Sequence, residues 1–543
     1  MDTLNSLGLS QQVSERRWWI FAVVCLSLLV IVMDNTILNV ALPTLARALG
    51  ASESQLQWFV DAYTLVFAGL LLSAGSLCDR YGRRLVLMVG LLLFAGGSLW
   101  AMLSGSADLL IAARTVMGLG AALIMPSTLA IIAAVFSGPE RGRAIGAWSG
   151  IAGLGIVIGP LVGGWLLDHF AWGSIFLINL PIVFVALVGT LWLVPESRDP
   201  EQAHLDPLGT LLSIAGLTAL VWGLIEAPQR GWEDRQILTA LGLALLLLLA
   251  FAIWEARTHR PMLDVRLFRN PRFSVASLVM TLTTFATFGV LLLLTQYLQF
   301  VVGQTPLQAG AALMPLVPTL LLGSIVAPRL NERLGPKLPV AIGLFIVAIG
   351  AGLLAFIQQG SGYSPVALML LITGLGLGLV AAPAATSIMD ALPVARAGVG
   401  SAVNDTTRQV GGALGVAVLG SVLSTVYRDA LQQHAAAILG QLPPVLRAAV
   451  RDSIGKAIVV AGQLPPPAQA LLRSAAERAF IEAFDRSALV TVSVLVVGAL
   501  VALLFLPARA RRQARVTNAV DLTPVGSPTT MKAREEEPSH DHS

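Results

Sequence analysis

The segment Gly75-Ser-Leu-Cys-Asp79-Arg80-Tyr-Gly82-Arg83-Arg84 lies between two long apolar stretches and decides the fold. A degenerate copy, Leu330-Asn-Glu332-Arg333-Leu-Gly335-Pro-Lys337, returns between two apolar stretches in the second part of the chain. The two segments match in the order acid, base, glycine, base, and each follows the second apolar stretch of its own half. The sequence therefore predicts a membrane protein built from two related halves.

The composition supports a protein that crosses the membrane many times. The 543 residues are 56% hydrophobic and only 12% charged, with a mean hydropathy of +0.78, whereas charged residues approach a quarter of a soluble domain. A spanning helix needs about 20 mostly apolar residues, and these stretches are too long and continuous for barrel strands. Fourteen helices are predicted, at 18–40, 57–78, 85–104, 108–135, 144–166, 174–194, 207–226, 236–255, 273–301, 308–328, 338–357, 364–389, 398–426 and 486–507.

The distribution of Lys and Arg predicts the orientation. Basic residues gather in alternate connections, while the short loops on the other side hold only Arg47, Arg230 and Arg235. Because basic loops stay cytoplasmic, both termini are expected inside. The net charge of +4 is then a topology signal, and no basic surface requires a nucleic-acid partner.

The repeat predicts the domain organisation. We expect a cytoplasmic N-terminus at 1–17, a six-helix bundle at 18–194, a linker with two additional helices at 195–272, a second six-helix bundle at 273–507, and a disordered cytoplasmic tail at 508–543. Repeats of this kind are typical of secondary transporters, whose binding site lies between the halves. An extracellular segment at 428–484 has Pro-rich breaks and predicts short amphipathic helices, either as a surface cap or with a regulatory role.

Two charged residues inside the first bundle are the leading candidates for proton coupling or substrate binding. Asp34 lies well inside the first span, where an ionised carboxylate costs about 2.5–3.5 kcal/mol and usually faces a cavity. Arg114 is the only base within the fourth span, and a guanidinium stays charged when buried, so it can alternate between carboxylates. The alternatives are a solvated Asp34 near an interface and an Arg114 that snorkels to the outer surface.

Three further charged residues are candidates for the same roles. Asp61 lies about one turn inside the outer end of the second span, where solvation at the interface is an equal alternative. Asp405 and Arg408 lie three residues apart on the thirteenth span. A structural ion pair and a coupling role are both open for them.

Candidates for conformational gating come from the repeated turn and from glycines. A pure positive anchor at Arg80 and Arg83 leaves Asp79 unexplained, and this carboxylate can pair with bases or with a helix N-terminus in one conformation and release them in the other. Small residues four apart allow helix backbones to approach closely. They occur on the fifth span at Gly142, Gly146 and Gly150 and then at Gly155, Gly159 and Gly163, with Pro160 and Gly164 beside them as further gating candidates, and on the thirteenth at Gly411, Gly412 and Gly415.

The sequence contains no motif for ATP binding, for a catalytic triad or for a metal site. There is no Gly-x-x-x-x-Gly-Lys-Ser/Thr segment for ATP, and no catalytic triad order or cluster of metal ligands, so we expect neither an enzyme nor a cofactor. Energy would then come from a proton gradient. Cys25 and Cys78 fall at different depths, which makes a disulfide between them improbable.

At these residues the chain resembles the major facilitator superfamily, and within it the fourteen-span drug:proton antiporter group of quaternary-ammonium and multidrug efflux pumps. Four segments carry the resemblance, namely Gly75 to Arg84, Asp34 to Pro43, Gly155 to Gly164 and Ile175-Phe-Leu-Ile-Asn-Leu-Pro181. The group's usual Gln before the fourth-span glycine is Met117 here, and its Trp-Arg-Trp before the sixth span appears as Ala171-Trp172-Gly173-Ser174. The resemblance implies proton-driven export from a bacterial inner membrane by alternating access, with Asp34 as the proton or cation site and Arg114 as its regulator.

Three functional hypotheses follow. The first is a drug:proton antiporter, acting as a monomer in the lipid bilayer, that exports amphipathic or cationic small molecules. The second is an exporter of one endogenous metabolite or lipid. The third is a membrane receptor or scaffold that does not transport, against which the buried charges argue because they are costly without a pathway.

Overall fold

The computed structural model describes residues 11–51, 53–198, 206–258, 261–357 and 361–507. These residues form helices and no strand, and fourteen of the helices are long and apolar enough to cross a membrane. The predicted all-α fold with fourteen spans is confirmed. Most of the predicted N-terminal segment 1–17 and the whole predicted tail 508–543 lie outside the described residues.

The helices follow one another along the chain with short connections. Those of the first half are α2 (Gln11–Leu49), α3 (Glu53–Tyr81), α4 (Arg83–Met102), α5 (Ala107–Val135), α6 (Gly138–His169), α7 (Ser174–Leu177) and α8 (Asn179–Leu193). The next are α9 (Pro207–Arg230), α10 (Arg235–Arg257) and η1 (Val265–Arg269). The second half contains α11 (Pro271–Gln296), η2 (Tyr297–Val301), α12 (Pro306–Ala311), α13 (Leu316–Leu334), α14 (Lys337–Leu353), η3 (Leu354–Phe356), α15 (Ser364–Met389), η4 (Val394–Arg396), α16 (Ala397–Gln441), α17 (Pro444–Asp452), α18 (Ile454–Ala461) and α19 (Pro466–Phe505).

Local sequence signals set several of the helix starts. The hydroxyl of Ser106 accepts from the backbone N–H of Leu109, and Asp206 accepts from that of Gly209, so both residues cap the helices that follow them. Thr305 and Gln308 form a reciprocal capping box at the start of α12. These caps satisfy backbone donors of the first helical turn that have no partner within the helix.

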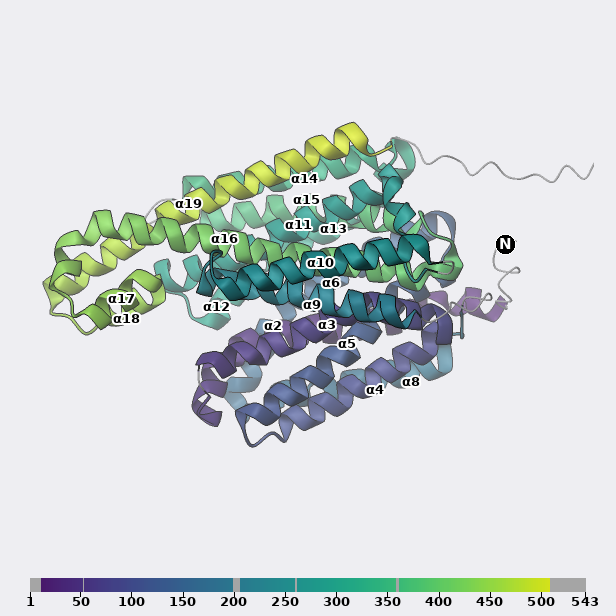
Figure 1. Cartoon of the computed structure of the whole chain (residues 1–543), viewed down its shortest axis with the longest axis horizontal. Coiled ribbons are helices and arrows are strands. Elements are labelled where there is room, and N and C mark those ends of the chain that lie inside the picture. The colour runs from purple at the N-terminus through teal and green to yellow at the C-terminus, as the bar shows by residue number, and fades with distance from the viewer. Residues whose placement is uncertain (1–10, 52, 199–205, 259–260, 358–360, 508–543) are drawn as a thin grey trace, which may run out of the picture. The chain divides into compact units, whose positions relative to one another are not determined.

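The two halves pack against each other through corresponding helices. Within the first half α2 packs on α6 and α8, and α3 and α4 both pack on α5; within the second half α11 packs on α16 and α19, and α13 and α14 both pack on α15. Contacts between the halves run from α3 to α16 and from α6 to α13 (Figure 1). Each of these contacts joins the second span of one half to the fifth span of the other, as a two-fold repeat requires.

The inserted helices α9 and α10 form a pair beside the contact between α3 and α16. Helix α9 packs on α3 of the first half and on α16 of the second half, whereas α10 packs mainly on α9. The indole of Trp254 on α10 donates to the Asp206 carboxylate at the start of α9, at 2.7 Å. Large side chains of α10 such as Leu245 and Leu246 are more than half exposed and suit a lipid-facing surface.

The extracellular segment predicted at 428–484 is built differently from the expectation. Helix α16 continues through the predicted span end at 426 to Gln441, and α19 begins at Pro466, twenty residues before the predicted start of the last span at 486. The backbone leaves the helical conformation at Ala435 (φ −129°, ψ 17°), so α16 is kinked there, and the part beyond the kink continues until Pro443 and Pro444 stop it. Short helices α17 and α18 fill only the turn between the two long ones.

We use two names for the ends of the helices. The termini end holds the start of α2 and the end of α19, and also the end of α3 and the start of α16. The far end holds the opposite ends, including the α9–α10 turn.

Candidate functional site

A buried ion pair lies inside the first half. Asp34 on α2 is 2% exposed and Arg114 on α5 is completely buried, and Nη1 of Arg114 donates to Oδ2 of Asp34 at 2.5 Å. The predicted alternatives of a solvated Asp34 and a snorkelling Arg114 are therefore wrong. Breaking such a buried pair by removing one partner costs about 3–5 kcal/mol, because the other charge is left uncompensated.

Three other helices complete the surroundings of this pair. The Asn179 amide at the start of α8 donates to Oδ1 of Asp34 at 2.9 Å and contacts the Ser98 hydroxyl of α4 at 3.2 Å. On α3, the Phe59 carbonyl accepts from Nε of Arg114 at 3.0 Å, and the Tyr63 ring lies 4.3 Å from the guanidinium carbon. Five helices of one half therefore converge on a single carboxylate and a single guanidinium.

One donor of Arg114 has a weak partner. The Nη1 atom faces the Met117 sulfur at 3.9 Å, at the position where the resembled group has Gln, and Nη2 has no hydrogen-bond partner among the described residues. A thioether is a much weaker acceptor than an amide oxygen. Asp34 is therefore the dominant partner of Arg114, apart from the Phe59 carbonyl and the Tyr63 ring.

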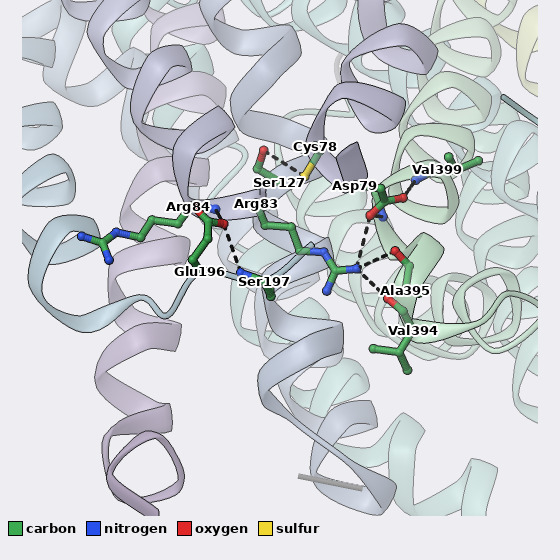
Figure 2. A network of polar contacts seen from close by, with 11 residues as sticks. Cys78, Asp79, Arg83, Arg84, Ser127, Glu196, Ser197, Val394, Ala395 and Val399 are labelled. Carbon is green, nitrogen blue, oxygen red and sulfur yellow. Dashed lines mark hydrogen bonds and ion pairs between the residues drawn. The ribbon is translucent and has the colours of Figure 1, made fainter. Parts of the chain in front are cut away.

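The second cluster ties the halves together at the termini end, where Asp79 meets the start of α16 (Figure 2). The two oxygens of Asp79 accept from the backbone N–H groups of Gly398 at 2.8 Å and Val399 at 3.0 Å. A carboxylate at a helix N-terminus satisfies unpaired donors and complements the helix dipole. The close approach depends on small residues, since a Cβ on Gly75 would lie 2.6 Å from the Gly398 carbonyl oxygen.

Arg83 extends the same cluster from the start of α4. It lies 3.2 Å from Asp79, and its Nη2 donates to the carbonyl groups of Val394 at 2.6 Å and Ala395 at 3.0 Å on η4 (Figure 2). The guanidinium thus joins both halves. Arg80, the other predicted base of this turn, lies over the Tyr81 ring at 5.4 Å.

Glu196, after the end of α8, caps the start of α4 and was not singled out from the sequence. Its carboxylate accepts from the backbone N–H group of Arg84 at 3.2 Å (Figure 2) and from that of Leu85 at 3.2 Å. Gly82, between α3 and α4, has φ +111°, and a Cβ there would lie 2.5 Å from the carboxyl carbon of Glu196. Glycine is thus required both for the backbone conformation and for the cap.

A second tie between the halves does not use the repeated acid. Asp390, at the end of α15, lies 3.6 Å from Arg141 on α6 and 3.8 Å from Arg272 on α11. Glu332, which corresponds to Asp79 in the repeat, is exposed and pairs with no described residue. The two copies of the repeated segment therefore differ in their contacts, since Asp79 joins the halves and Glu332 does not.

The glycines of α6 pack on two different partners. A Cβ on Gly146 would lie 2.8 Å from the Ser324 carbonyl oxygen of α13, in the other half. A Cβ on Gly155 would lie 2.8 Å from Val32 of α2, and one on Gly163 would lie 3.1 Å from Ile37. Gly159 also packs on α2, while Pro160 and Gly164 meet Gly310 and Leu307 of the second half. The predicted close packing is present, with α6 between α2 and the second half.

The remaining predicted residues lie in separate places. Asp61 is 9% exposed, and its neighbour is Glu226 of α9. Asp405 is buried and accepts from the Asn404 amide at 3.1 Å. Arg408 acts on Asp405 electrostatically without a contact at salt-bridge distance. Its guanidinium lies 5.8 Å from the ring of Trp148 on α6, whose indole donates to Thr128. The structure brings Asp34 and Arg114 together but leaves Asp61 and Asp405 apart from them.

The second half has an apolar pocket in the place of the buried ion pair. Thr287, Leu316, Ala351, Thr373 and Thr491 line it from α11, α13, α14, α15 and α19. Leu316 and Tyr63 both lie 19 residues before the glycine of the repeated segment, and Thr491 and Asn179 both lie 14 residues before the end of their helices. At these equivalent positions, Tyr63 and Asn179 contact the ion pair in the first half, whereas Leu316 and Thr491 line the apolar pocket in the second.

No metal or disulfide chemistry accompanies these clusters in the described part of the chain. No group of three or more His, Cys, Asp or Glu residues there could hold a metal ion. Cys25 and Cys78 are both buried and free, as predicted.

Comparison with known proteins places this geometry in a family. Residues 24–416 match the description "Major Facilitator Superfamily". The chain belongs to this superfamily. The recognition of the superfamily and of its multidrug efflux branch from the sequence is confirmed.

Superfamily relatives of known name are numerous. "Multidrug resistance protein Stp" of Mycobacterium tuberculosis is 37% identical over 75% of this chain and 76% of its own length. "Multidrug efflux pump LfrA" of Mycolicibacterium smegmatis is 33% identical over 82% of this chain and 87% of its own. "Tetracenomycin C resistance and export protein" of Streptomyces glaucescens is 33% identical over 81% and 82%.

Solved superfamily structures share the fold at low sequence identity. The human organic anion transporter MFSD10 superimposes with a TM-score of 0.56 at 17% identity, over 88% of this chain and 99% of its own. A bacterial homologue of the human lysosomal transporter Spinster, inward-facing and unoccupied, gives 0.54 at 17% identity, over 93% and 100%.

Proposed function

We propose that this protein is a proton-coupled antiporter that exports amphipathic and cationic compounds from a bacterial cytoplasm by alternating access. The relatives named for multidrug resistance, efflux and antibiotic export support this substrate class. In this proposal the protein acts as a monomer in the inner membrane, and the termini end is cytoplasmic. A proton gradient supplies the energy, and no enzymatic step or cofactor takes part.

The observation that carries the proposal is the buried Asp34–Arg114 pair with its Asn179 donor. A carboxylate inside a spanning helix has a cost that a purely structural site could avoid with apolar residues. The pair is neutral while Asp34 is ionised. When Asp34 binds a proton, Arg114 becomes a buried charge without its counter-ion, and this cost favours a change of conformation that gives Arg114 another partner.

The contacts of Asp79 and Arg83 supply the conformational part of the cycle. Both side chains hold the second half at the termini end through the backbone of Val394, Gly398 and Val399. In our proposal this cluster is formed when the cytoplasmic side is closed and is released when that side opens. The glycines of α6 and Gly75 permit the sliding of helices that opening requires.

The test is proton movement in proteoliposomes that contain a pH-sensitive dye. A panel of quaternary ammonium compounds, dyes and antibiotics is added to the wild type and to Asp34→Asn under an imposed proton gradient. We expect substrate-triggered proton movement in the wild type and its loss in Asp34→Asn. Asp168→Asn is the matched control, since Asp168 is an exposed carboxylate on α6, and it should behave as the wild type.

Two other results would change the conclusion. Full coupling in a well-folded Asp34→Asn variant would remove Asp34 from the proton site. No proton movement with any member of the panel would favour the exporter of a single endogenous metabolite or lipid, or a protein that does not transport.

A further inference from the structure

A second set of charged side chains joins the first half to the inserted helix pair at the far end. Gln57 on α3 donates to Oε1 of Glu226 on α9 at 3.3 Å, and it also hydrogen-bonds Asp61, one turn further along α3. Glu226 and Asp61 are 8% and 9% exposed. One amide therefore links two buried carboxylates that come from different parts of the fold.

A single guanidinium accompanies these carboxylates. Nε of Arg230 donates to Oε2 of Glu226 at 2.5 Å, Nη1 donates to Gln236 at 2.5 Å, and the group lies 5.7 Å from the Trp222 ring. Asp234, at the start of α10, also acts electrostatically on Arg230. On α5 the nearby acid is Asp108, which accepts from Gln55 at 2.9 Å.

The contact between α3 and α9 next to these carboxylates is apolar. Leu65 and Ala68 of α3 are buried against Val221 of α9, with Trp222 and Ile225 packed beside them. Apolar side chains therefore border Asp61 and Glu226 on the side that faces away from the far end. Two carboxylates and one guanidinium carry a net negative charge, which becomes zero when one proton is bound, and low-dielectric surroundings favour the neutral form.

The inserted pair also reaches the second half at the same level. The indole of Trp232, in the α9–α10 turn, donates to the Ser421 hydroxyl of α16 at 2.8 Å. Helix α9 therefore bridges α3 and α16, the two helices whose other ends meet at Asp79 and Gly398. Any movement that changes the separation of α3 and α16 must also change the surroundings of Glu226.

We infer that Glu226 is a coupling residue of the transport cycle, sharing one proton with Asp61 at the far end while Arg230 provides the compensating charge. This inference rests on the proposed antiport. The proton enters from the water outside, forms an O–H bond on one of the two carboxylates and returns to water when α3 and α9 change their separation. Helices α9 and α10 then take part in coupling rather than serving only as a linker.

The test uses two substitutions that break the same ion pair with opposite charge effects. Glu226→Gln removes a negative neighbour of Asp61, and Arg230→Gln removes a positive one. The initial rate of dye efflux from cells is measured across a range of external pH. We expect the midpoint of the pH profile to move to lower pH by about one unit in Glu226→Gln and to higher pH by a similar amount in Arg230→Gln.

Controls separate coupling from structure. Glu226→Asp keeps the charge and should keep the midpoint, and Glu233→Gln removes an exposed acid of the same turn and should behave as the wild type. If the first two variants keep the wild-type midpoint, or if both move it in the same direction, the pair is structural and the inference is wrong. Melting temperatures of the purified proteins show whether a loss of rate is a loss of folding.

Together with the proteoliposome test of Asp34→Asn, the pH profiles distinguish the inference from the proposed function. Loss of coupling in Asp34→Asn together with unchanged midpoints in the Glu226 and Arg230 variants would overturn only the role of Glu226. Retained coupling in Asp34→Asn would overturn the proposed function itself.

Discussion

At the scale of single residues, the buried carboxylate of Asp34 depends on donors from two other helices, α5 and α8. Arg114 supplies the opposite charge, and Asn179 supplies a neutral donor to the other oxygen. The neutral donor matters because a carboxylate with one unpaired buried oxygen loses much of the stabilisation that the ion pair gives. The Asn179 amide, on α8, also donates to the Ser98 hydroxyl on α4, and this second hydrogen bond fixes its orientation.

Asn179→Leu should weaken this site without changing its volume greatly. The loss of the donor to Asp34 leaves a buried acceptor unsatisfied, at a cost of about 1–3 kcal/mol. We expect a lower melting temperature of the purified protein and reduced proton-coupled efflux. Ser98→Ala removes only the second contact and should have a smaller effect, so equal effects of the two variants would contradict this account.

The sequence indicated part of this site and missed the rest. Asp34 and Arg114 stood out because each is a lone charge in an apolar stretch. Asn179 is the only strongly polar residue of Ile175-Phe-Leu-Ile-Asn-Leu-Pro181, a signal that could have identified it. Its partner could not be read from the sequence, because the contact joins helices far apart in the chain.

At the scale of secondary structure, the crossing of α3 and α16 requires glycine at two positions. A Cβ on Gly398 would lie 2.5 Å from the Gly75 carbonyl oxygen and 2.8 Å from the Asp79 carboxyl group. The sequence predicted that Asp79 would meet a base or a helix N-terminus, and the structure shows both. It did not predict which helix, because neither charge nor periodicity specifies pairing across the halves.

Gly398→Ala should separate Asp79 from the start of α16. The added methyl group displaces the carboxylate, so the charge-assisted bonds to Gly398 and Val399 are lost. We expect the equilibrium to shift toward states open at the termini end, measured as increased distances between spin labels on α3 and α16. Gly400→Ala, where a Cβ would meet only Met389 and Leu392 at 3.2 Å or more, should leave those distances unchanged.

Gly82→Ala should destabilise the start of α4 by a different route. Alanine disfavours φ +111°, and its Cβ would collide with the carboxylate of Glu196 that caps α4. We expect a loss of about 1–2 kcal/mol, seen as a lower melting temperature. Gly105→Ala, with open space around the added atom, is the control, and an equal loss there would argue against the collision.

At the scale of the whole molecule, the two halves share a fold but differ in chemistry. Equivalent positions hold the Asp34–Arg114 network in the first half and an apolar pocket with three threonines in the second. The halves are joined at the termini end by Asp79 and by Asp390, although the repeated segment would suggest Asp79 and Glu332. The duplication was visible in the sequence, but the divergence of the contacts was not, since an exposed and a buried acid look alike in a sequence.

The Asp79 contact and the Asp390 contact should each contribute to closure at the termini end. Asp79→Asn removes the charge at α16, and Asp390→Asn removes the bridge to Arg141. Asp79 and Asp390 share no ion-pair partner, but Arg83 and Arg141 act on each other electrostatically, so we expect the two effects on the opening equilibrium to add with a coupling of about 0.5 kcal/mol. Labelling rates of a cysteine introduced between α6 and α13 would measure this, and a double variant no more open than either single one would show that one tie controls closure alone.

The contact of Arg408 with Trp148 has a spectroscopic consequence. All eleven tryptophans lie at or before Trp254, so the second half contributes no indole emission. Trp148 is fully buried, and the cation beside its ring belongs to the opposite half. In a variant whose other ten tryptophans are replaced by phenylalanine, all indole fluorescence would come from Trp148. Its emission would change whenever the Arg408 charge of the second half moves relative to the ring, so it would report the relative movement of the halves during transport.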